Sequence, residues 1–281
     1  MTQTAAPAAR RRRTDVPRYA VLVVTSLLFF APVAYMVAAS LAPASRTLAG
    51  FEVFDPREWG LHNYTGVASS LSSDSTGHLW RFFFVSVTVT VSVVALGLVV
   101  NSMAAFALSR LTWRGRNLVL LGVLLLLIVP FEAVAVPMFY LYNDARNTLW
   151  IQIVPFIGNA LSIFLFYSFF SGIPRSIDEA ARMDGVGPVR LYWNIILPMS
   201  LPSLVTTGLL AFITAWNEFL FALAFTSNID TQTIPVGIAN FTNLYYVPWG
   251  DIAAASAVVT VPLILLVLFF QRHIIEGLTQ G

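Results

Sequence analysis

The sequence predicts an all-α, polytopic membrane protein with six transmembrane helices. Of its 281 residues, 57% are hydrophobic and only 11% are charged, whereas roughly a quarter of an ordinary soluble domain is charged. So few charges could not cover a water-soluble surface, which makes membrane embedding the first interpretation. Six stretches also have the length that a bilayer demands, about 20 apolar residues for about 30 Å of hydrocarbon. These stretches are 19–41, 82–109, 117–143, 147–174, 201–226 and 252–271.

Four of the six stretches contain no charged residue, and the two exceptions carry one glutamate each: Glu132 in the third and Glu218 in the fifth. Helices are the form expected for all six, because backbone groups in lipid must be hydrogen-bonded within the segment. The runs also lack the alternating pattern of transmembrane barrel strands. Pro130, Pro137 and Pro262 are expected to kink the helices that contain them.

The organisation of the chain follows from these spans. Residues 1–18, rich in Ala, Pro and Arg, are expected to form a disordered cytoplasmic tail, followed by the first transmembrane helix at 19–41. Residues 42–80 form the longest outer loop, which has Pro, Gly and Ser throughout and is too short for an independent domain. Residues 81–275 hold a five-helix core that includes a cytoplasmic loop at 172–200. No length remains for a soluble catalytic domain.

The distribution of arginine predicts the orientation in the membrane. With the N-terminus inside, the cytoplasmic segments hold twelve of the sixteen basic residues, and the outer loops hold only Arg46, Arg57, Arg81 and Arg146. Cytoplasmic loops of membrane proteins carry such an excess. Both termini are therefore expected in the cytoplasm. The basic cluster at 10–13 before an apolar run also fits a signal peptide, but the run is longer than a typical signal core.

Several kinds of site find no support in the sequence. Cysteine is absent, which excludes disulfides, thiolate zinc sites and a thiol nucleophile. The three histidines, His62, His78 and His273, are too scattered for a metal cluster. An intramembrane enzyme would need a Ser/His pair or an aspartate pair within its spans, and the spans show neither. The cluster at 10–13 is interpreted as a topology anchor at the membrane lipid, and no nucleic-acid partner is expected.

The loop between the fourth and fifth spans carries the most information. Pro174 is expected to end the preceding membrane helix. Ser176, with Glu179 three positions later, forms a capping box, which predicts the start of a new helix. Gly185 is expected to end this helix, because glycine often follows the C-cap. A short helix is therefore predicted between these residues.

The predicted short helix needs a surface to pack against. Ile177, Ala180 and Ala181 fall on one face of it, and a second helix is predicted over 189–197, closed by Pro198. A helix of about ten residues is marginal alone in water. Its apolar stripe could lie in a groove of a partner protein or against this protein's own helix ends. Composition leaves both interpretations open.

The same loop reproduces a pattern of seven fixed positions: Glu179, Ala180, Ala181, Gly185, Ile195, Leu197 and Pro198. This pattern resembles the EAA loop of ABC-importer permeases, which reads Glu-Ala-Ala, three residues, Gly, nine residues, Ile-x-Leu-Pro. Every spacing matches, and the pattern lies in the expected loop. The residues at 172–200 are called the coupling loop from here on, after the function that this resemblance implies.

The resemblance extends over roughly residues 60–280. Further stretches similar to carbohydrate permeases lie at 101–117, 129–141, 216–220 and 270–278. The chain is identified as a member of the carbohydrate uptake family of ABC-importer permeases, in the group of the smaller maltose-transporter permease. Phe106 stands where a tyrosine is usual. The resemblance implies the type I ABC importer permease fold.

The resemblance also implies the partners. In this family two permease subunits form the pathway, each resting on an ATPase subunit, and an extracytoplasmic binding protein delivers the substrate at the bacterial plasma membrane. The coupling helix seats in a cleft of the ATPase, and the residues of that joint would be Glu179, Ala180, Ala181, Asp184 and Gly185.

ATP and magnesium are expected on the partner ATPase, with no cofactor in this chain. The chain has neither a Gly-x-x-x-x-Gly-Lys-Ser/Thr loop nor any lysine. It is therefore expected to be a transport subunit without catalytic residues, and not an enzyme.

Glu132 and Glu218 are candidates for the solute path. A charged side chain facing lipid costs about 2.5–3.5 kcal/mol, so each is expected to face protein or a water-filled path. In the functional interpretation, Glu218, Asn217 and Trp216 offer a carboxylate, an amide and an aromatic face to a sugar. In the structural interpretation, the glutamates form hydrogen bonds across a helix interface or lie near a membrane face. The sequence is compatible with both.

Sugars are the substrate class that the resemblance implies, and glycerol phosphate or its diesters are the alternative. A secondary transporter that works without ATP is a more remote alternative. It would need paired charges or discontinuous helices in the membrane, and it leaves the EAA pattern unexplained.

Overall fold

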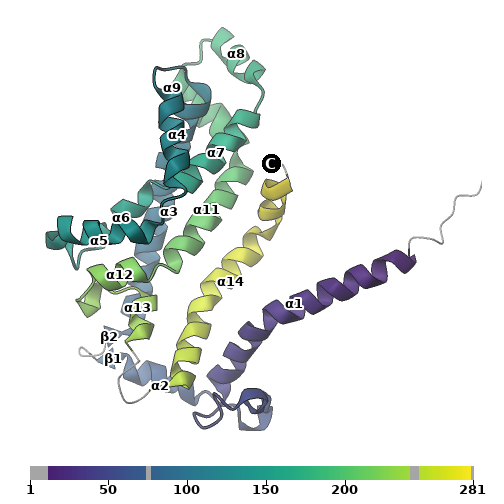
Figure 1. Ribbon diagram of the computed structural model, residues 1–281, viewed down its shortest axis with the longest axis vertical. Coiled ribbons are helices and arrows are strands. Elements are labelled where there is room, and N and C mark those ends of the chain that lie inside the picture. The colour runs from purple at the N-terminus through teal and green to yellow at the C-terminus, as the bar shows by residue number, and fades with distance from the viewer. Residues whose placement is uncertain (1–11, 74–76, 241–246, 280–281) are drawn as a thin grey trace, which may run out of the picture. The chain divides into compact units, whose positions relative to one another are not determined.

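The structure, a computed structural model, describes residues 12–73, 77–240 and 247–279. Within these residues nearly every element is a helix (Figure 1), and the one sheet is a hairpin of two short antiparallel strands, β1 (Ser72–Ser73) and β2 (Gly77–His78). The predicted all-α class is therefore confirmed.

The chain forms two compact units. The first consists of Met1–Ser69 and Thr242–Val258. Its elements are α1 (Arg12–Leu41), η1 (Gly50–Phe54), η2 (Pro56–Glu58), most of α2 (His62–Ser70) and the start of α14 (Trp249–Thr279). Helix α1 begins inside the segment predicted as a disordered tail, of which residues 1–11 lie outside the described residues.

A buried asparagine holds the end of α1 within this unit. The Asn63 amide nitrogen donates to the carbonyls of Ser40 and Ala42, both at 2.9 Å. A Cβ on Gly250 would come within 2.5 Å of the Asn63 amide oxygen, so the start of α14 needs glycine there. Most of α1 remains exposed. Lipid or another membrane helix must therefore cover its apolar side chains, because water cannot do so favourably.

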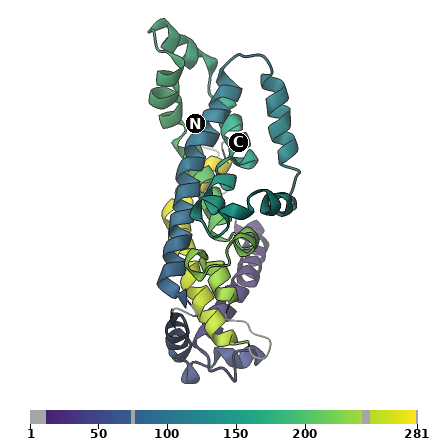
Figure 2. The same cartoon turned by 90° about the vertical axis from the view of Figure 1, so that its left-hand side faces the viewer.

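The second unit consists of Ser70–Phe241 and Val259–Gly281. Its longest helix, α3 (Leu79–Arg110), runs through the unit as a single rod (Figure 2) and packs against α6, α7 and α11. The elements after α3 are α4 (Arg116–Leu126), α5 (Phe131–Leu141), η3 (Asn143–Ala145), α6 (Leu149–Ile157), α7 (Ala160–Gly172), α8 (Arg175–Met183), α9 (Pro188–Leu191), the π-helical turn η4 (Tyr192–Ile196), α10 (Leu197–Met199), α11 (Leu201–Trp216), α12 (Leu220–Phe225), η5 (Ile229–Thr231), α13 (Ile234–Ala239) and the rest of α14.

The number of membrane spans agrees with the prediction when broken helices are counted. Among the described residues, four apolar helices or helix pairs are long enough to cross a bilayer: Pro17–Leu41, Leu79–Arg110, Leu149–Gly172 and Trp249–Gln271. Two further spans are bent pairs, α4 with α5 at 98° and the α9–α10 stretch with α11 at 80°. Six spans result if each bent pair counts as one.

The predicted proline effects vary in size. Pro130 lies at the break between α4 and α5, so the chain turns there far more sharply than at a simple kink. Proline lacks the N–H that would continue the preceding helix. Pro137 and Pro262 lie inside α5 and α14.

Candidate functional site: the coupling loop and the central cavity

Helix α8 lies at one end of the second unit, beyond α7 and α9 (Figure 1). It begins at Arg175, with Pro174 as the N-cap residue, and no side chain caps it. The predicted capping box of Ser176 and Glu179 is therefore wrong. The extended backbone of Pro174 starts the helix two residues earlier than predicted, which puts Ser176 inside the first turn instead of at the cap.

The predicted end of this helix is confirmed. Gly185 has a φ of +74°, a left-handed conformation that favours glycine. The Gly185 N–H donates to the Arg182 carbonyl at 3.0 Å, and the Val186 N–H donates to the Ala181 carbonyl at 2.9 Å. These two bonds form a Schellman motif, which satisfies carbonyls that the helix end leaves free.

The second predicted helix begins at Pro188 and does not stop at Pro198. It continues through the π-helical turn to Met199 and ends at Ser200. The prediction that Pro198 closes the helix is wrong, because the helix runs one residue past this proline to Met199. Proline removes a backbone hydrogen bond from a helix, and the π-helical turn with its altered hydrogen-bond spacing ends two residues before it.

The two sides of α8 have different environments. Ala181 is buried and Ile177 half-buried, and both pack into a core cluster with Phe170 and Ile196. Ala180 was predicted on this face but is exposed. One face of α8 therefore packs against the protein's own core, as one of the two interpretations proposed. Docking in a groove of a partner protein can apply only to the other face.

The other face of α8 and the turn that follows it are exposed within the second unit. The predicted coupling residues Glu179, Asp184 and Gly185 are exposed there, as is Ala180. Met183 is also 88% exposed. An apolar side chain so open, beside small and acidic residues, suits a surface that another protein covers.

A buried ion pair joins α8 to the end of α3. Arg110, the last residue of α3, and Asp178, in the first turn of α8, are separated by 3.1 Å between Nη1 and Oδ2. Nη2 of Arg110 also donates to the carbonyls of Phe170 and Ile173, the latter at 2.8 Å. Arg110 therefore binds the C-terminal end of α7 as well, where a cation is favourable.

Sequence reasoning missed this pair. Arg110 was counted among the cytoplasmic arginines and lay within the stretch 101–117 that resembles carbohydrate permeases, but it was given no partner, and Asp178 was given no role. A signal did exist, because Asp178 lies three residues before Ala181 and thus on the same side of the helix. An aspartate on the buried side of a short helix requires a basic partner.

Three helix breaks surround one cavity of about 400 Å³, called here the central cavity. The breaks are the start of α5, the junction of α6 with α7, and the junction of α11 with α12. The lining residues are Phe131, Glu132, Pro155, Phe156, Gly158, Asn159, Thr214, Asn217, Glu218, Phe219 and Leu220. Broken membrane helices form solute sites in transporters, because their free backbone ends need polar partners.

The structure brings together three of the four residues predicted for the solute path. Glu132, Asn217 and Glu218 all line the central cavity. Trp216 does not line it and is only 3% exposed. Its indole N–H donates to the Val259 carbonyl at 3.2 Å, and its ring stacks on Phe212. Its aromatic face is therefore not open to a sugar in this conformation.

The Glu218 carboxylate has a structural role as well as a place on the cavity wall. Its two oxygens accept from the backbone N–H groups of Phe221 and Ala222, at 2.8 and 2.9 Å. These are amides of the first turn of α12 that have no partner within the helix. The hydrogen bonds of Glu218 are thus local to the start of α12. The structural interpretation of the sequence had instead placed them across a helix interface.

Asparagines hold the junction between α6 and α7. The Asn101 amide nitrogen donates to the Ile157 carbonyl at 2.9 Å, and its oxygen accepts from the Asn159 N–H at 3.0 Å. The Asn159 side chain in turn accepts from the Ser162 N–H at 2.9 Å. These bonds replace helix hydrogen bonds that the break removes, which explains a buried amide at membrane depth.

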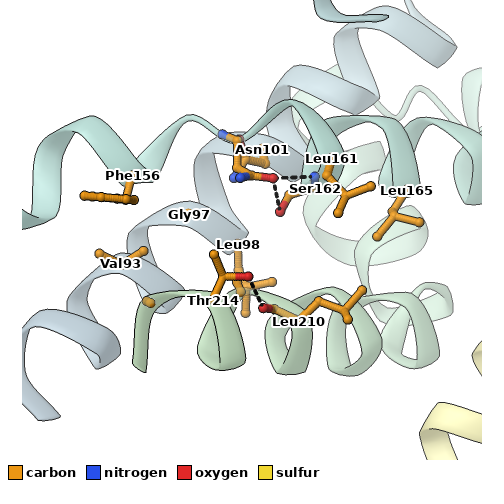
Figure 3. Close-up of a pocket in the computed structure, with 13 residues that line it drawn as sticks. Val93, Gly97, Leu98, Asn101, Phe156, Leu161, Ser162, Leu165, Leu210 and Thr214 are labelled. Carbon is orange, nitrogen blue, oxygen red and sulfur yellow. Dashed lines mark hydrogen bonds between the residues drawn. The ribbon is translucent and has the colours of Figure 1, made fainter. Parts of the chain in front are cut away.

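A smaller cavity of about 60 Å³ adjoins the central one and shares Phe156, Asn159 and Thr214 with it. Figure 3 shows its labelled side chains, which come from α3, α6, α7 and α11. Thr214 uses its hydroxyl within its own helix, donating to the Leu210 carbonyl at 2.9 Å. This extension of the central cavity is mostly apolar.

Residues 97–280 match a known protein family, described as "Binding-protein-dependent transport system inner membrane component". The trehalose/maltose transport system permease protein MalG of Thermococcus litoralis is 36% identical over 229 residues, which cover 79% of this chain and 80% of the relative. The trehalose transport system permease protein SugB of Mycobacterium tuberculosis is 34% identical over 257 residues, covering 89% and 90%.

A third relative is the arabinooligosaccharides transport system permease protein AraQ of Halalkalibacterium halodurans, 32% identical over 254 residues, which cover 89% of each chain. Among solved structures, a chain of a bacterial ABC transporter involved in the import of the acidic polysaccharide alginate aligns with a TM-score of 0.79. It is 21% identical, and the alignment covers 96% of this chain and 99% of that one. This likeness confirms the predicted importer permease fold.

Proposed function

Because the chain belongs to the family of binding-protein-dependent transport system inner membrane components, we propose that it is the permease subunit of a sugar ABC importer whose coupling loop docks on an ATPase. Its relatives are transport permeases and not enzymes. The chain is accordingly a multi-pass transport subunit of the inner membrane.

The two-sided environment of α8 is the observation that carries the coupling function. Asp178 and Ala181 attach one side of the helix to the protein's own core, while Glu179, Ala180 and Met183 are exposed. A helix fixed on one side moves as a rigid body with its unit, and its free side can lie in a cleft of a partner. A movement of the ATPase would then be transmitted to the membrane helices.

Sugars are supported by the names of the three relatives and by the chemistry of the central cavity. Its volume falls within the usual range for small-molecule sites, about 300–1,000 Å³. Glu132, Glu218 and Asn217 supply hydrogen-bonding groups for hydroxyls, and Phe131 and Phe219 supply aromatic surface. Among the described residues, none that lines this cavity is basic. Two carboxylates without a basic group disfavour a phosphate, so the glycerol phosphate alternative has less support.

The remaining parts of the importer follow from this assignment. The coupling loop and both termini lie in the cytoplasm, and the loop holding Ser227 lies outside. A second permease completes the pathway, and an extracytoplasmic binding protein delivers the sugar. ATP and magnesium bind to the ATPase subunits. An importer driven by ATP explains the EAA pattern, which a secondary transporter leaves unexplained.

Single cysteines test the assignment directly, because the natural chain has none. Met183→Cys should cross-link to the co-expressed ATPase and resist an impermeant thiol reagent applied to intact cells. Ser227→Cys, the matched exposed control, should react with that reagent and form no cross-link to the ATPase. Uptake of labelled trehalose, maltose and arabinooligosaccharides by cells lacking their own importers then tests the substrate class. The reverse labelling pattern, or no cross-link from Met183→Cys, would refute the proposed coupling.

A further inference from the structure

A third and much smaller space borders Glu218 and is separate from the central cavity. It measures about 10 Å³ and is bounded by α3, α6, α11, α12 and the residue before α13. Its polar lining residues are Gln152, Glu218 and Thr233, and the rest of the lining is apolar. Phe156 and Glu218 belong to both spaces. This space is called the inner pocket below.

Gln152 presents an acceptor that no described residue satisfies. The side chain is 3% exposed, and its amide nitrogen donates to the Thr231 carbonyl at 2.9 Å. This bond fixes the orientation of the amide, since the reverse orientation would place two oxygens against each other. The Gln152 Oε1 atom is therefore the group left over, and it is buried without a hydrogen-bond partner.

Thr233 presents a hydroxyl that is likewise unpartnered among the described residues. The residue is 6% exposed, and its Oγ1 atom is buried. It occupies the N-cap position of α13 but forms no cap hydrogen bond. The next amide, that of Ile234, donates instead to the Ser86 hydroxyl at 2.8 Å. The Thr233 hydroxyl is thus free to bond with something in the inner pocket.

We propose that a single buried water molecule occupies the inner pocket and links Gln152, Thr233 and Glu218. The hydrogen bonds balance: the water donates to Gln152 Oε1 and to the Glu218 carboxylate, and accepts from the Thr233 hydroxyl. A volume of about 10 Å³ lies at the lower limit of the space that one water needs, roughly 10–15 Å³, and so leaves no space for a second. Buried waters typically form about three hydrogen bonds to polar groups that would otherwise be unsatisfied.

The chemistry of the pocket favours water over a cation. A hard cation takes six or more oxygen ligands, whereas this pocket offers three side chains and an apolar wall of Val89, Val93 and Ala222. Both Glu218 oxygens already accept backbone N–H groups, which partly offsets the negative charge. The third bond of the carboxylate, to the water, would fix Glu218 on the wall of the central cavity.

The first test is a structure of the complete transporter in lipid nanodiscs, at a resolution that shows ordered water. One density peak is expected within hydrogen-bond distance of all three side chains. In the Thr233→Val variant that peak should be lost, while Thr233→Ser should retain it. A wild-type pocket without density, or a peak that persists unchanged in Thr233→Val, would overturn the proposal. This outcome is independent of the proposed sugar and ATPase.

The second test is a double-mutant cycle on the thermal unfolding midpoint of the same assembly. If one water joins the two residues, the shifts caused by Gln152→Leu and Thr233→Val should not add, because each removes part of the same bridge. Thr207 is the matched control: it is a buried threonine that does not line this pocket, and its hydroxyl has no partner in the described part of the chain. The shift of Thr207→Val should add to that of Gln152→Leu.

A cation would give a different result. In that case the wild-type midpoint would rise when choline chloride is replaced by sodium chloride at equal ionic strength, and Gln152→Leu would remove the rise. Such a result, or additive shifts for Gln152→Leu and Thr233→Val, would overturn the assignment of water. Equal midpoints in the two salts, with non-additive shifts, would support it.

Discussion

Arg110 and Asp178 form an ion pair in which the side chains are only 1% and 4% exposed, although 68 residues separate them. The pair connects the last residue of α3 with the first turn of α8. Arg175, which follows Pro174, donates in return to the carbonyls of Ser109 and Arg110 at the end of α3. Both contacts come from the first turn of α8, where Arg175 and Asp178 also lie 3.7 Å apart, so the start of α8 is attached to the end of α3.

Removing one member of this pair should be strongly destabilising. Arg110→Met leaves the buried Asp178 carboxylate with Arg175, 3.7 Å away and more than half exposed, as its remaining cationic neighbour. Breaking a buried pair costs about 3–5 kcal/mol, and the nearby Arg175 places the expected cost toward the lower end of that range. The double variant Arg110→Met, Asp178→Leu should recover a large part of that loss, because no buried charge remains. Unfolding midpoints of the purified assembly measure both effects.

An exposed ion pair of the same unit provides the control. Arg81 and Asp230 are separated by 3.0 Å, but both side chains are about half exposed. Arg81→Met should cost at most about 1 kcal/mol, since water screens such pairs. A similar loss of stability for Arg81→Met and Arg110→Met would show that burial of the Arg110–Asp178 pair is unimportant.

Gly185 and Gly187 allow a test of the end of α8. A Cβ meets no atom within 4 Å at either position, so steric crowding is excluded at both. Only Gly185 has a positive φ, which costs a residue with a side chain roughly 1–2 kcal/mol. Gly185→Ala should therefore distort the loop and lower the sugar imported per ATP hydrolysed, whereas Gly187→Ala should not.

This ratio should fall while the amount of permease in the membrane stays unchanged. Bulky replacements of Gly185 or of Glu179 should have a larger effect, since they also alter the surface proposed to meet the ATPase. Wild-type uptake by both bulky variants would remove the coupling function from this loop.

The two glutamates of the central cavity should respond differently to loss of charge. Glu218→Gln replaces one acceptor oxygen with an amide donor, leaving a first-turn N–H of α12 without a partner. The expected cost is about 1–3 kcal/mol. Glu132 has no hydrogen bond or ion pair within the described part of the chain, so Glu132→Gln should change stability by less than about 0.5 kcal/mol.

Uptake by Glu132→Gln is consequently the cleaner measure of a charge in the solute path. A several-fold fall in uptake with unchanged unfolding would support contact with the sugar. Full uptake by Glu132→Gln and by Asn217→Ala would contradict a solute path through the central cavity.

The sequence allowed prediction of the helices and of the coupling pattern, but not of how the helices break. Hydropathy shows that residues are apolar but contains no information on the direction of the helix axis. The 98° turn at Pro130 was therefore predicted only as a kink within one span. The six-residue helix α12 was likewise merged with α11. The cavity formed by these breaks could not be predicted, because it depends on residues that only the fold brings together.

Long-range partners were beyond reach for the same reason. Trp216 lies in the same apolar stretch as Glu218 and two residues before it, yet its side chain contacts Phe212 and Val259 and does not line the central cavity. Its position in the sequence next to Asn217 says nothing about that rotation. By contrast, Gly185 was predicted correctly, because a helix end is determined by local hydrogen bonds and the conformational freedom of one glycine.

Neighbouring alanines separate docking from folding most sharply. Ala180 is exposed, and Ala181 is 5% exposed within the core cluster of α8. The same substitution to leucine should therefore have opposite consequences. Ala181→Leu overpacks the core at a cost of about 1–3 kcal/mol, whereas Ala180→Leu should leave unfolding unchanged and weaken binding of the ATPase.

Copurification of the ATPase and the unfolding midpoint of the permease measure the two effects separately. Ala180→Ser, which adds little volume, should retain both. If Ala180→Leu bound the ATPase as tightly as the wild type, the exposed side of α8 would not be the docking surface, even though Ala181→Leu behaved as expected.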